Sequence, residues 1–253
     1  MLTNKKTRQQ DITFFFKQGI EPRKIILWNN QGVPEFFNAQ DSNGVNVVFM
    51  EGLEFHIRKP EDEMLVRETH LRLQHQKQFY MTPPEYFPMI LAQSYQQMHG
   101  KPLDWNNLQT WTEKMQWVKL YDNTPIKTRL ADKFLVREWI AEKIGADYLI
   151  PLLGVWDNFD EIDFDALPNQ FVLKCNHGSG MNIIVRDKKD FDIESAREKI
   201  NAWLAIDYGA LYIEPHYNNI PKKIIAEKFM TDNENFDLID YKFLCFDGEV
   251  KYL

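Results

Sequence analysis

The stretch of sequence that decides the fold is Phe171-Val172-Leu173-Lys174-Cys175-Asn176-His177-Gly178-Ser179-Gly180. Its first half has the composition of an apolar strand that carries one lysine, and its second half is a loop of small residues. Glycines let backbone amides approach phosphate oxygens, and a lysine offers a compact positive charge to the same anion. The spacing matches neither a Walker A loop nor GxGxxG. A solvated lysine at a strand edge, followed by an ordinary turn, also fits, and the pattern alone favours that structural interpretation.

Further strands are predicted on the C-terminal side of this stretch. Residues 182–185 are apolar, which places the small-residue loop at the tip of a hairpin. Residues 224–230 are predicted to form a third strand. Residues 239–246 are expected to pair with 249–253 across Asp247-Gly248, a dipeptide that favours a two-residue hairpin turn.

Helices are predicted between these strands. One covers residues 85–99, and a second opens at the capping box Thr110-Trp111-Thr112-Glu113. A third begins at Asp132 and stops at Gly145, and a fourth covers residues 192–206. Helices mixed with hairpins predict an α+β fold.

The N-terminal part of the chain has a different pattern. Short apolar runs at 25–28, 45–49 and 53–57 alternate with turn residues and predict strands, and a charged helix is expected over 61–77. Thr82-Pro83-Pro84 then interrupts the chain. We therefore divide it into residues 1–82, a β-rich segment plus a helix without an assigned role, and residues 83–253.

Composition limits the function classes. The net charge of −7 argues against binding of nucleic acids, which requires a surplus of lysine and arginine. The two cysteines lie far apart and form no disulfide framework or metal pair, which favours a cytoplasmic location. The N-terminus is polar and basic, unlike a signal peptide, and no apolar run is long enough to span a membrane.

Two other groups of polar residues are candidates for chemistry. Glu227, at the end of a strand, could accept a hydrogen bond from an exocyclic amine, while the backbone of Lys228, Phe229 and Met230 reads an adenine edge. A surface Glu–Lys pair is the plainer explanation. Asp240 and Lys242 are expected on one face of a strand, because side chains alternate. They could hold a phosphate and its metal, or simply be solvated.

Lys133 and Arg137 lie four residues apart at the start of a predicted helix, whose N-terminus favours anions. By itself this spacing indicates a charged outer helix face. Spacings among the histidines match no zinc site, and we predict no metal ligands within the chain.

Taken together, the segments resemble the TupA-like branch of the ATP-grasp superfamily. The resemblance rests on an ordered set of segments at residues 110–122, 131–137, 145–153, 171–180, 224–227 and 240–248. It covers about two-thirds of the chain and is far more specific than any single motif. It also reverses the interpretation of Lys174 and the loop that follows it.

The resemblance implies an ATP-grasp-like architecture, in which two subdomains with antiparallel sheets clamp ATP. Lys174 would hold the α- and β-phosphates, and the loop His177, Gly178, Ser179 and Gly180 would close over the triphosphate. Glu227 with Lys228, Phe229 and Met230 would lie at the adenine. Lys133 and Asp240 would line the phosphate side, while Arg137 and Lys242 would serve the reaction itself.

The same resemblance implies an ATP-dependent carboxylate–amine ligase that acts through an acylphosphate in bacterial cell-surface polysaccharide biosynthesis. The expected partners are a nucleotide, an acidic glycan or its precursor, and polysaccharide-assembly proteins at the inner membrane face. The family's Mg²⁺ ligands would lie beyond Leu253, so we expect the C-terminal part to be incomplete. A glycan-modifying transferase or kinase, or an inert nucleotide-binding fragment, are the alternatives.

Overall fold

The structure is a computed structural model that describes residues 21–28, 34–40, 43–231 and 241–252, with only the backbone described for the first two of these ranges. The strands are β1 (Glu21–Trp28), β2 (Pro34–Gln40), β3 (Asn46–Met50), β4 (Leu53–Ile57), β5 (Leu152–Trp156), β6 (Phe171–Cys175), β7 (Asn182–Val185), β8 (Ile224–Lys228), β9 (Leu244–Phe246) and β10 (Glu249–Tyr252). The α-helices are α2 (Pro60–Met81), α3 (Phe87–His99), α4 (Trp111–Tyr121), α5 (Pro125–Ala131), α6 (Leu135–Ile144), α7 (Ile193–Leu204) and α8 (Tyr208–Tyr212).

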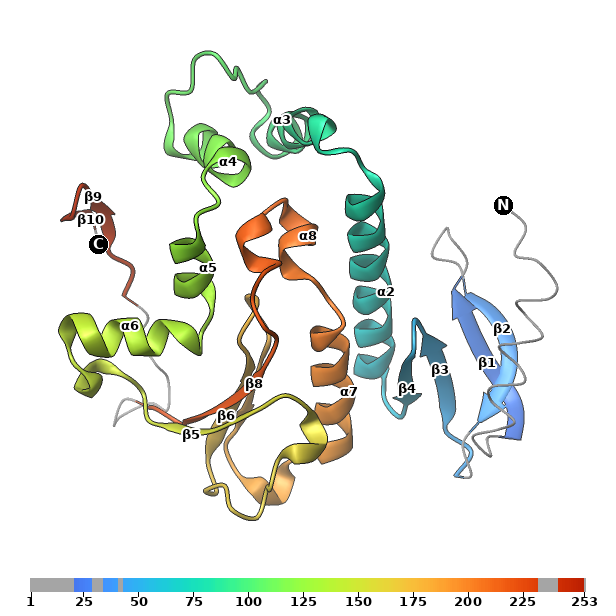
Figure 1. Cartoon of the computed structure of the whole chain (residues 1–253). Coiled ribbons are helices and arrows are strands. Elements are labelled where there is room, and N and C mark those ends of the chain that lie inside the picture. Colours follow the sequence, from blue (N-terminus) through green and yellow to red (C-terminus); the bar gives the residue numbers. More distant parts are fainter. Residues whose placement is uncertain (1–20, 29–33, 41–42, 232–240, 253) are drawn as a thin grey trace.

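The central element is a four-stranded sheet in the order β5-β8-β6-β7, with every neighbouring pair antiparallel. Strands β6 and β7 form the hairpin that the sequence predicts around the small-residue loop. Strand β8, which arrives from much later in the chain, inserts between β5 and β6. Figure 1 shows this sheet at the base of the molecule, between α6 and α7.

The two faces of this sheet differ because side chains alternate along each strand. The face of Phe171, Leu173 and Cys175 is fully buried and belongs to the main hydrophobic core, to which α7 contributes Ile200. The other face of β6 carries Lys174. One face of the sheet therefore builds the core, and the other carries charge.

Capping residues explain where the helices begin and end. The predicted capping box opens α4, since Thr110 and Glu113 bond each other's backbone amides. Asp192 caps α7 by accepting from the Ser195 amide at 2.9 Å. Helix α6 ends at Gly145, which has a φ of 108°. The capping box and the stop at Gly145 are confirmed, but α6 begins at Leu135 rather than at the predicted Asp132.

The N-terminal sheet has the order β1-β2-β3-β4. Strand β2 was not predicted from the sequence, whereas β1, β3 and β4 were. Helix α2 follows β4 and packs against α7 and α8, and it separates the N-terminal sheet from the central part (Figure 1). Val48, Phe55 and Val66 share a small buried cluster with Ala202 of α7. The last part of the N-terminal segment is thus joined to the central sheet's helices by apolar packing.

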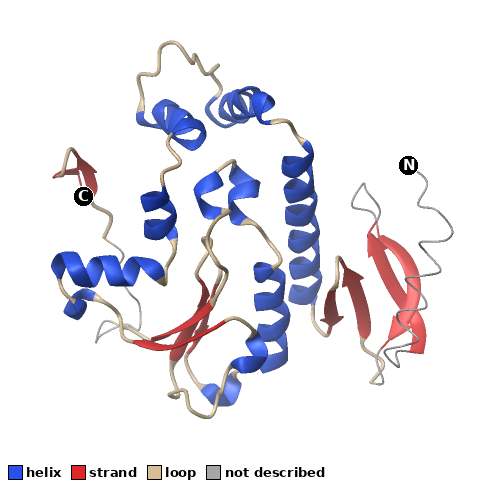
Figure 2. Cartoon of the chain, viewed as in Figure 1, coloured by secondary structure: helices blue, strands red, loops and turns tan. Residues whose placement is uncertain are grey.

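Strands β9 and β10 form the second predicted hairpin, with Asp247 and Gly248 both at positive φ, 51° and 78°. The first strand is shorter than predicted, because it begins at Leu244 rather than at residue 239. Helices and mainly antiparallel sheets confirm the α+β class (Figure 2). Among the described residues, none of the helices combines the length and the apolar character that crossing a membrane requires.

Candidate functional site

The charged face of the central sheet centres on Glu227, which is only 7% exposed. Glu227 lies opposite Val172 on the neighbouring strand, and Lys174 lies opposite Ile225, so the two charged residues share one face diagonally. The Lys174 Nζ atom lies 2.5 Å from one carboxylate oxygen of Glu227. The sequence predicted both residues as site residues, and the sheet register brings them together.

Arg137 reaches the same carboxylate from the first turn of α6. One guanidinium nitrogen lies 2.8 Å from the second oxygen of Glu227. The other terminal nitrogen donates to the carbonyl of Ile150, just before β5. Arg137 is therefore fixed at two points and ties α6 to the sheet across 90 residues of sequence.

Lys133 joins this group from the segment between α5 and α6. Its Nζ atom donates to the carbonyl of Gly178, and its backbone amide donates to the carbonyl of Asn176 at 3.2 Å. Burial lowers the pKa of Lys133, and the positive charge of Lys174 lowers it further. The two lysines are thus close enough to repel each other.

Charge on this face is unbalanced. Arg137 and Lys174 both contact the single carboxylate of Glu227, and Lys133 lies close enough to Lys174 for their charges to interact. Asp132, the other acid near Lys133, is buried and bonded to the start of α6. Such a surplus of positive charge in a partly buried place favours binding of an anion, since water screens it only weakly there.

The loop after β6 is largely buried. The ring of His177 is 1% exposed, and its Nε2 atom lies 3.1 Å from the Trp203 carbonyl. Burial lowers the pKa of His177 to about 4, so the ring is neutral at pH 7. Ser179 and Gly180 are exposed, and Gly180 has a φ of +73°. In this conformation only the tip of the loop and its backbone face solvent.

Gly178 holds the loop close to α8. A Cβ atom at this position would lie 2.7 Å from the ring of Tyr208. No larger residue fits without moving that ring, which explains in packing terms why the loop has a glycine here.

The chain is hydrogen-bonded at Lys228, the last residue of β8, and becomes exposed by Met230. The Lys228 amide donates to the Pro151 carbonyl at 2.9 Å, and the Arg186 guanidinium lies 5.5 Å from the Phe229 ring. Met230 is 41% exposed. Their predicted contact with a base stays a prediction.

The sequence predicted that Lys242 lies on a strand, and this prediction is wrong. Lys242 lies exposed just before β9, outside any regular element. The alternation argument therefore does not apply to it, because the strand starts two residues later. Asp240 lies outside the described residues.

Two residues of this region were not predicted to matter. Asn176 is fully buried and bonds to the Asp132 carboxylate at 2.9 Å. The sequence signal was weak: a polar residue directly after an apolar strand, and an acid where a helix opens.

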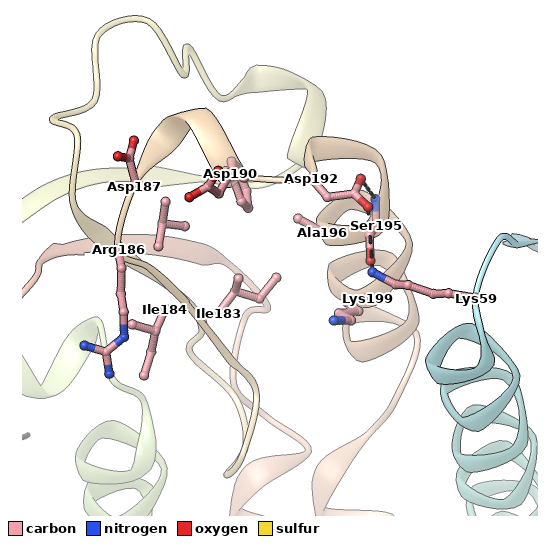
Figure 3. A pocket seen from close by; sticks show the side chains of 12 residues that line it. Lys59, Ile183, Ile184, Arg186, Asp187, Asp190, Asp192, Ser195, Ala196 and Lys199 are labelled. Atoms are coloured by element: carbon pink, nitrogen blue, oxygen red, sulfur yellow. Dashed lines mark hydrogen bonds and ion pairs between the residues drawn. The ribbon is translucent and has the colours of Figure 1, made fainter.

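A cavity of about 340 Å³ lies elsewhere, between β7 and the start of α7 (Figure 3). Its lining includes Ile183, which shares the core face of the sheet with Leu173. Of its three lining aspartates, Asp192 caps α7 and lies 3.8 Å from Lys59, and Asp187 accepts from the Lys189 amide. Lys133, Arg137, Lys174 and Glu227 do not line this cavity.

Comparison with known proteins gives one family match. A family model described as TupA-like ATPgrasp matches residues 113–253, a range that contains every residue of the charged group. No curated protein and no solved structure matches the chain.

Proposed function

The chain belongs to the TupA-like ATP-grasp family, whose model covers more than half of it, and on that premise we propose that the charged sheet face binds the phosphates of ATP. The observation that carries the proposal is the group of three cations, Lys133, Arg137 and Lys174, beside the carboxylate of Glu227, which Arg137 and Lys174 contact directly. A triphosphate would balance the surplus positive charge.

Each residue then has a distinct part in binding. Lys174 is the best candidate for a direct phosphate contact, because its side chain is 26% exposed, whereas that of Arg137 is 14% exposed. Glu227 holds both cations in place. The exposed backbone at Ser179 and Gly180 is close in sequence to Lys174 and would cover the phosphates. The two-subdomain clamp and the adenine contacts of residues 228–230 are part of the same proposal.

The proposed reaction is carboxylate–amine ligation. A carboxylate oxygen of the acceptor attacks the γ-phosphorus of ATP, the bond to ADP breaks, and an acylphosphate forms. An amine nitrogen then attacks the acyl carbon, phosphate leaves, and the nitrogen loses one proton. The cations of the site would stabilise the charge on the transferring phosphoryl group, which is the main requirement of such a step.

Magnesium does not fit the described residues as a protein-bound ion. Mg²⁺ prefers several oxygen ligands in an octahedral shell. Within the described ranges no group of three or more His, Cys, Asp and Glu side chains could hold a metal ion. The one carboxylate of the charged face already contacts two cations. We therefore derive no step through a metal.

The acceptor that we propose is an acidic glycan or its precursor, in the synthesis of a bacterial surface polysaccharide. This acceptor is what the family resemblance implies, and the uronic acids of such a glycan would supply the carboxylate that an acylphosphate needs. A cytoplasmic location at the inner membrane face, beside assembly proteins, belongs to the same proposal.

Isothermal titration with ATP and Mg²⁺ tests the nucleotide site. Lys174→Ala should weaken ATP binding about tenfold to a hundredfold, because a lost charge-assisted hydrogen bond costs about 1.5–3 kcal/mol. Lys189→Ala is the matched control, since it removes one exposed lysine of the same sheet's edge region. Equal affinity in wild type and Lys174→Ala would rule out the proposed role.

Product analysis tests the reaction class. With a uronic-acid polymer and an amine, a ligase yields an amide, ADP and free phosphate. A kinase yields a phosphorylated sugar and ADP without free phosphate. Phosphorylated sugar as the product would replace the ligase proposal with the kinase.

A further inference from the structure

We propose that Asp132 and Asn176 are positioning residues of the nucleotide site, which fix where its cations stand without touching the nucleotide. The inference rests on the proposed function. It starts from a buried hydrogen-bonded pair that joins three separate segments of the chain.

Asp132 controls the junction between α5 and α6. One of its carboxylate oxygens accepts from the amides of Phe134 at 2.8 Å and Leu135 at 3.2 Å, and it also accepts from the side-chain amide of Asn176 at 2.9 Å. Its own backbone amide closes α5 by donating to Thr128, at 3.1 Å. The direction in which α6 leaves the junction is thus set by a single side chain.

Asn176 uses the whole of its side chain in the interior. The amide nitrogen donates to Asp132 and to the Pro221 carbonyl, both at 2.9 Å, and the amide oxygen accepts from the Lys223 amide at 2.7 Å. Its backbone amide donates to the Lys223 carbonyl at 3.1 Å, and its carbonyl accepts from Lys133. Only an asparagine of this shape supplies two donors and one acceptor in this arrangement.

The pair thereby determines the geometry of the charged face. Lys133 follows Asp132 directly, and Arg137 lies in the first turn of α6, whose start bonds to the Asp132 carboxylate. Lys174 precedes Asn176 by two residues, and β8, which carries Glu227, begins directly after the segment that Asn176 holds. All four charged residues are therefore attached to segments that meet at this one pair.

Burial separates this role from direct binding. Asp132 is 1% exposed and Asn176 is 0% exposed, so neither side chain reaches a ligand on the sheet face. Satisfied buried networks of this kind favour a single arrangement of the segments they join, because any other leaves polar groups without partners. A loss of the pair should therefore act on ATP affinity through the cations.

Asp132 also has an electrostatic effect that a purely structural residue would lack. The charged or titratable groups that act on Lys133 are Lys174 and Cys175 of β6, Glu227 of β8, and Asp132 itself. Burial lowers the pKa of Lys133, and the negative charge of Asp132 opposes that change. Asp132→Asn should therefore lower this pKa further.

The experiment is a double-mutant cycle on ATP affinity, measured by titration with ATP and Mg²⁺. Asn176→Asp keeps the shape but removes both donors of the side-chain amide and places two carboxylates together. It should weaken ATP binding about tenfold, which corresponds to about 1.4 kcal/mol. In a Lys174→Ala background the same change should weaken binding by less than about threefold, because the cation it positions is gone.

A matched control separates positioning from general loss of stability. Glu198→Gln changes a side chain on α7 that is, like Asn176, polar, buried and hydrogen-bonded. It lies away from the charged face. The substitution should lower the melting temperature but leave the dissociation constant for ATP within about twofold.

The outcomes are distinct. If wild type binds ATP and Lys174→Ala weakens binding, but Asn176→Asp changes nothing or the cycle is additive, the positioning role is wrong while the proposed function stands. If wild type binds no ATP, both are wrong. If Asn176→Asp does not fold, Asp132→Asn is the deciding variant. As the pH is raised, its affinity for ATP should decrease at a lower pH than the affinity of wild type does. An unshifted pH profile overturns the inference.

Discussion

Glu227 and Glu198 are equally buried, at 7% exposure each, and each contacts two basic side chains, yet they lie in regions with different roles. Glu227 contacts Lys174 and Arg137 on the sheet face opposite the core. Glu198, on α7, contacts His56 at 3.1 Å and Arg58 at 2.9 Å, both at the end of β4. The first links the parts of a candidate site, and the second fastens the N-terminal sheet to the main core.

The difference lies in the balance of charge around each glutamate. Around Glu198 a second acid, Glu54, lies 3.4 Å from His56, so basic and acidic groups are equal in number. Around Glu227 three basic groups, Lys133, Arg137 and Lys174, outnumber the two acids Glu227 and Asp132. A buried carboxylate with partners is therefore no sign of a binding site by itself. A surplus of opposite charge beside it is the more informative feature.

The strongest test of this comparison is to remove each carboxylate charge. Glu227→Gln should lower the free energy of unfolding by about 3 kcal/mol, because it leaves cations buried without a counter-charge. Inorganic triphosphate should restore part of this loss, since the anion replaces the missing charge. Urea unfolding with and without triphosphate measures both effects.

Glu198→Gln provides the contrast for that experiment. It should also destabilise the protein, but triphosphate should restore nothing beyond its effect on wild type, because no surplus of positive charge is exposed there. Equal recovery in both variants, or recovery in neither, would contradict the distinction between the two glutamates.

Much of the fold was predictable because its signals are local. The hairpin between β6 and β7, the turn at Asp247-Gly248 and the capping box at Thr110 each depend on residues close in sequence. Lys174 was predicted to bind phosphate only through the resemblance to the family, because the local pattern alone favoured a solvated lysine.

The rest depends on contacts that sequence patterns do not encode. Arg137 and Glu227 meet across 90 residues only because β8 inserts beside β5. The hydrogen bond of Asp132 with Asn176 joins residues 44 positions apart, so the sequence, which placed Asp132 at a helix start, did not predict it. Lys242 was placed on a strand because a hairpin across Asp247-Gly248 was expected to extend back to residue 239, but the strand starts only at Leu244.

A smaller effect is expected from exchanging the arginines for lysines. Arg137→Lys should lower the free energy of unfolding by about 1–2 kcal/mol, because one ammonium group cannot occupy the places of two guanidinium nitrogens at Glu227 and Ile150. Arg58→Lys should cost only about 0.5 kcal/mol, since that side chain is 32% exposed and contacts Glu198 through one nitrogen. Equal losses in the two variants, measured by urea unfolding, would show that Arg137 has no special double anchorage.

A further small effect concerns pH and arises at Glu198 through its contact with His56. Hydrogen bonding to Glu198 raises the pKa of His56 above its ordinary 6.5, although burial and Arg58 oppose the change and Glu54 adds to it. A raised pKa in the folded state means that the stabilisation is fully present below pH 6.5 and is lost as the pH rises through the folded-state pKa. Between about pH 5.5 and 8.5, wild type should lose about 1 kcal/mol of unfolding free energy relative to His56→Gln, a modest amount because the ring is partly exposed. Arg137→Lys leaves His56 and its partners unchanged, so it should keep the wild-type slope. A flat difference between wild type and His56→Gln would mean that Glu198 holds β4 through Arg58 alone.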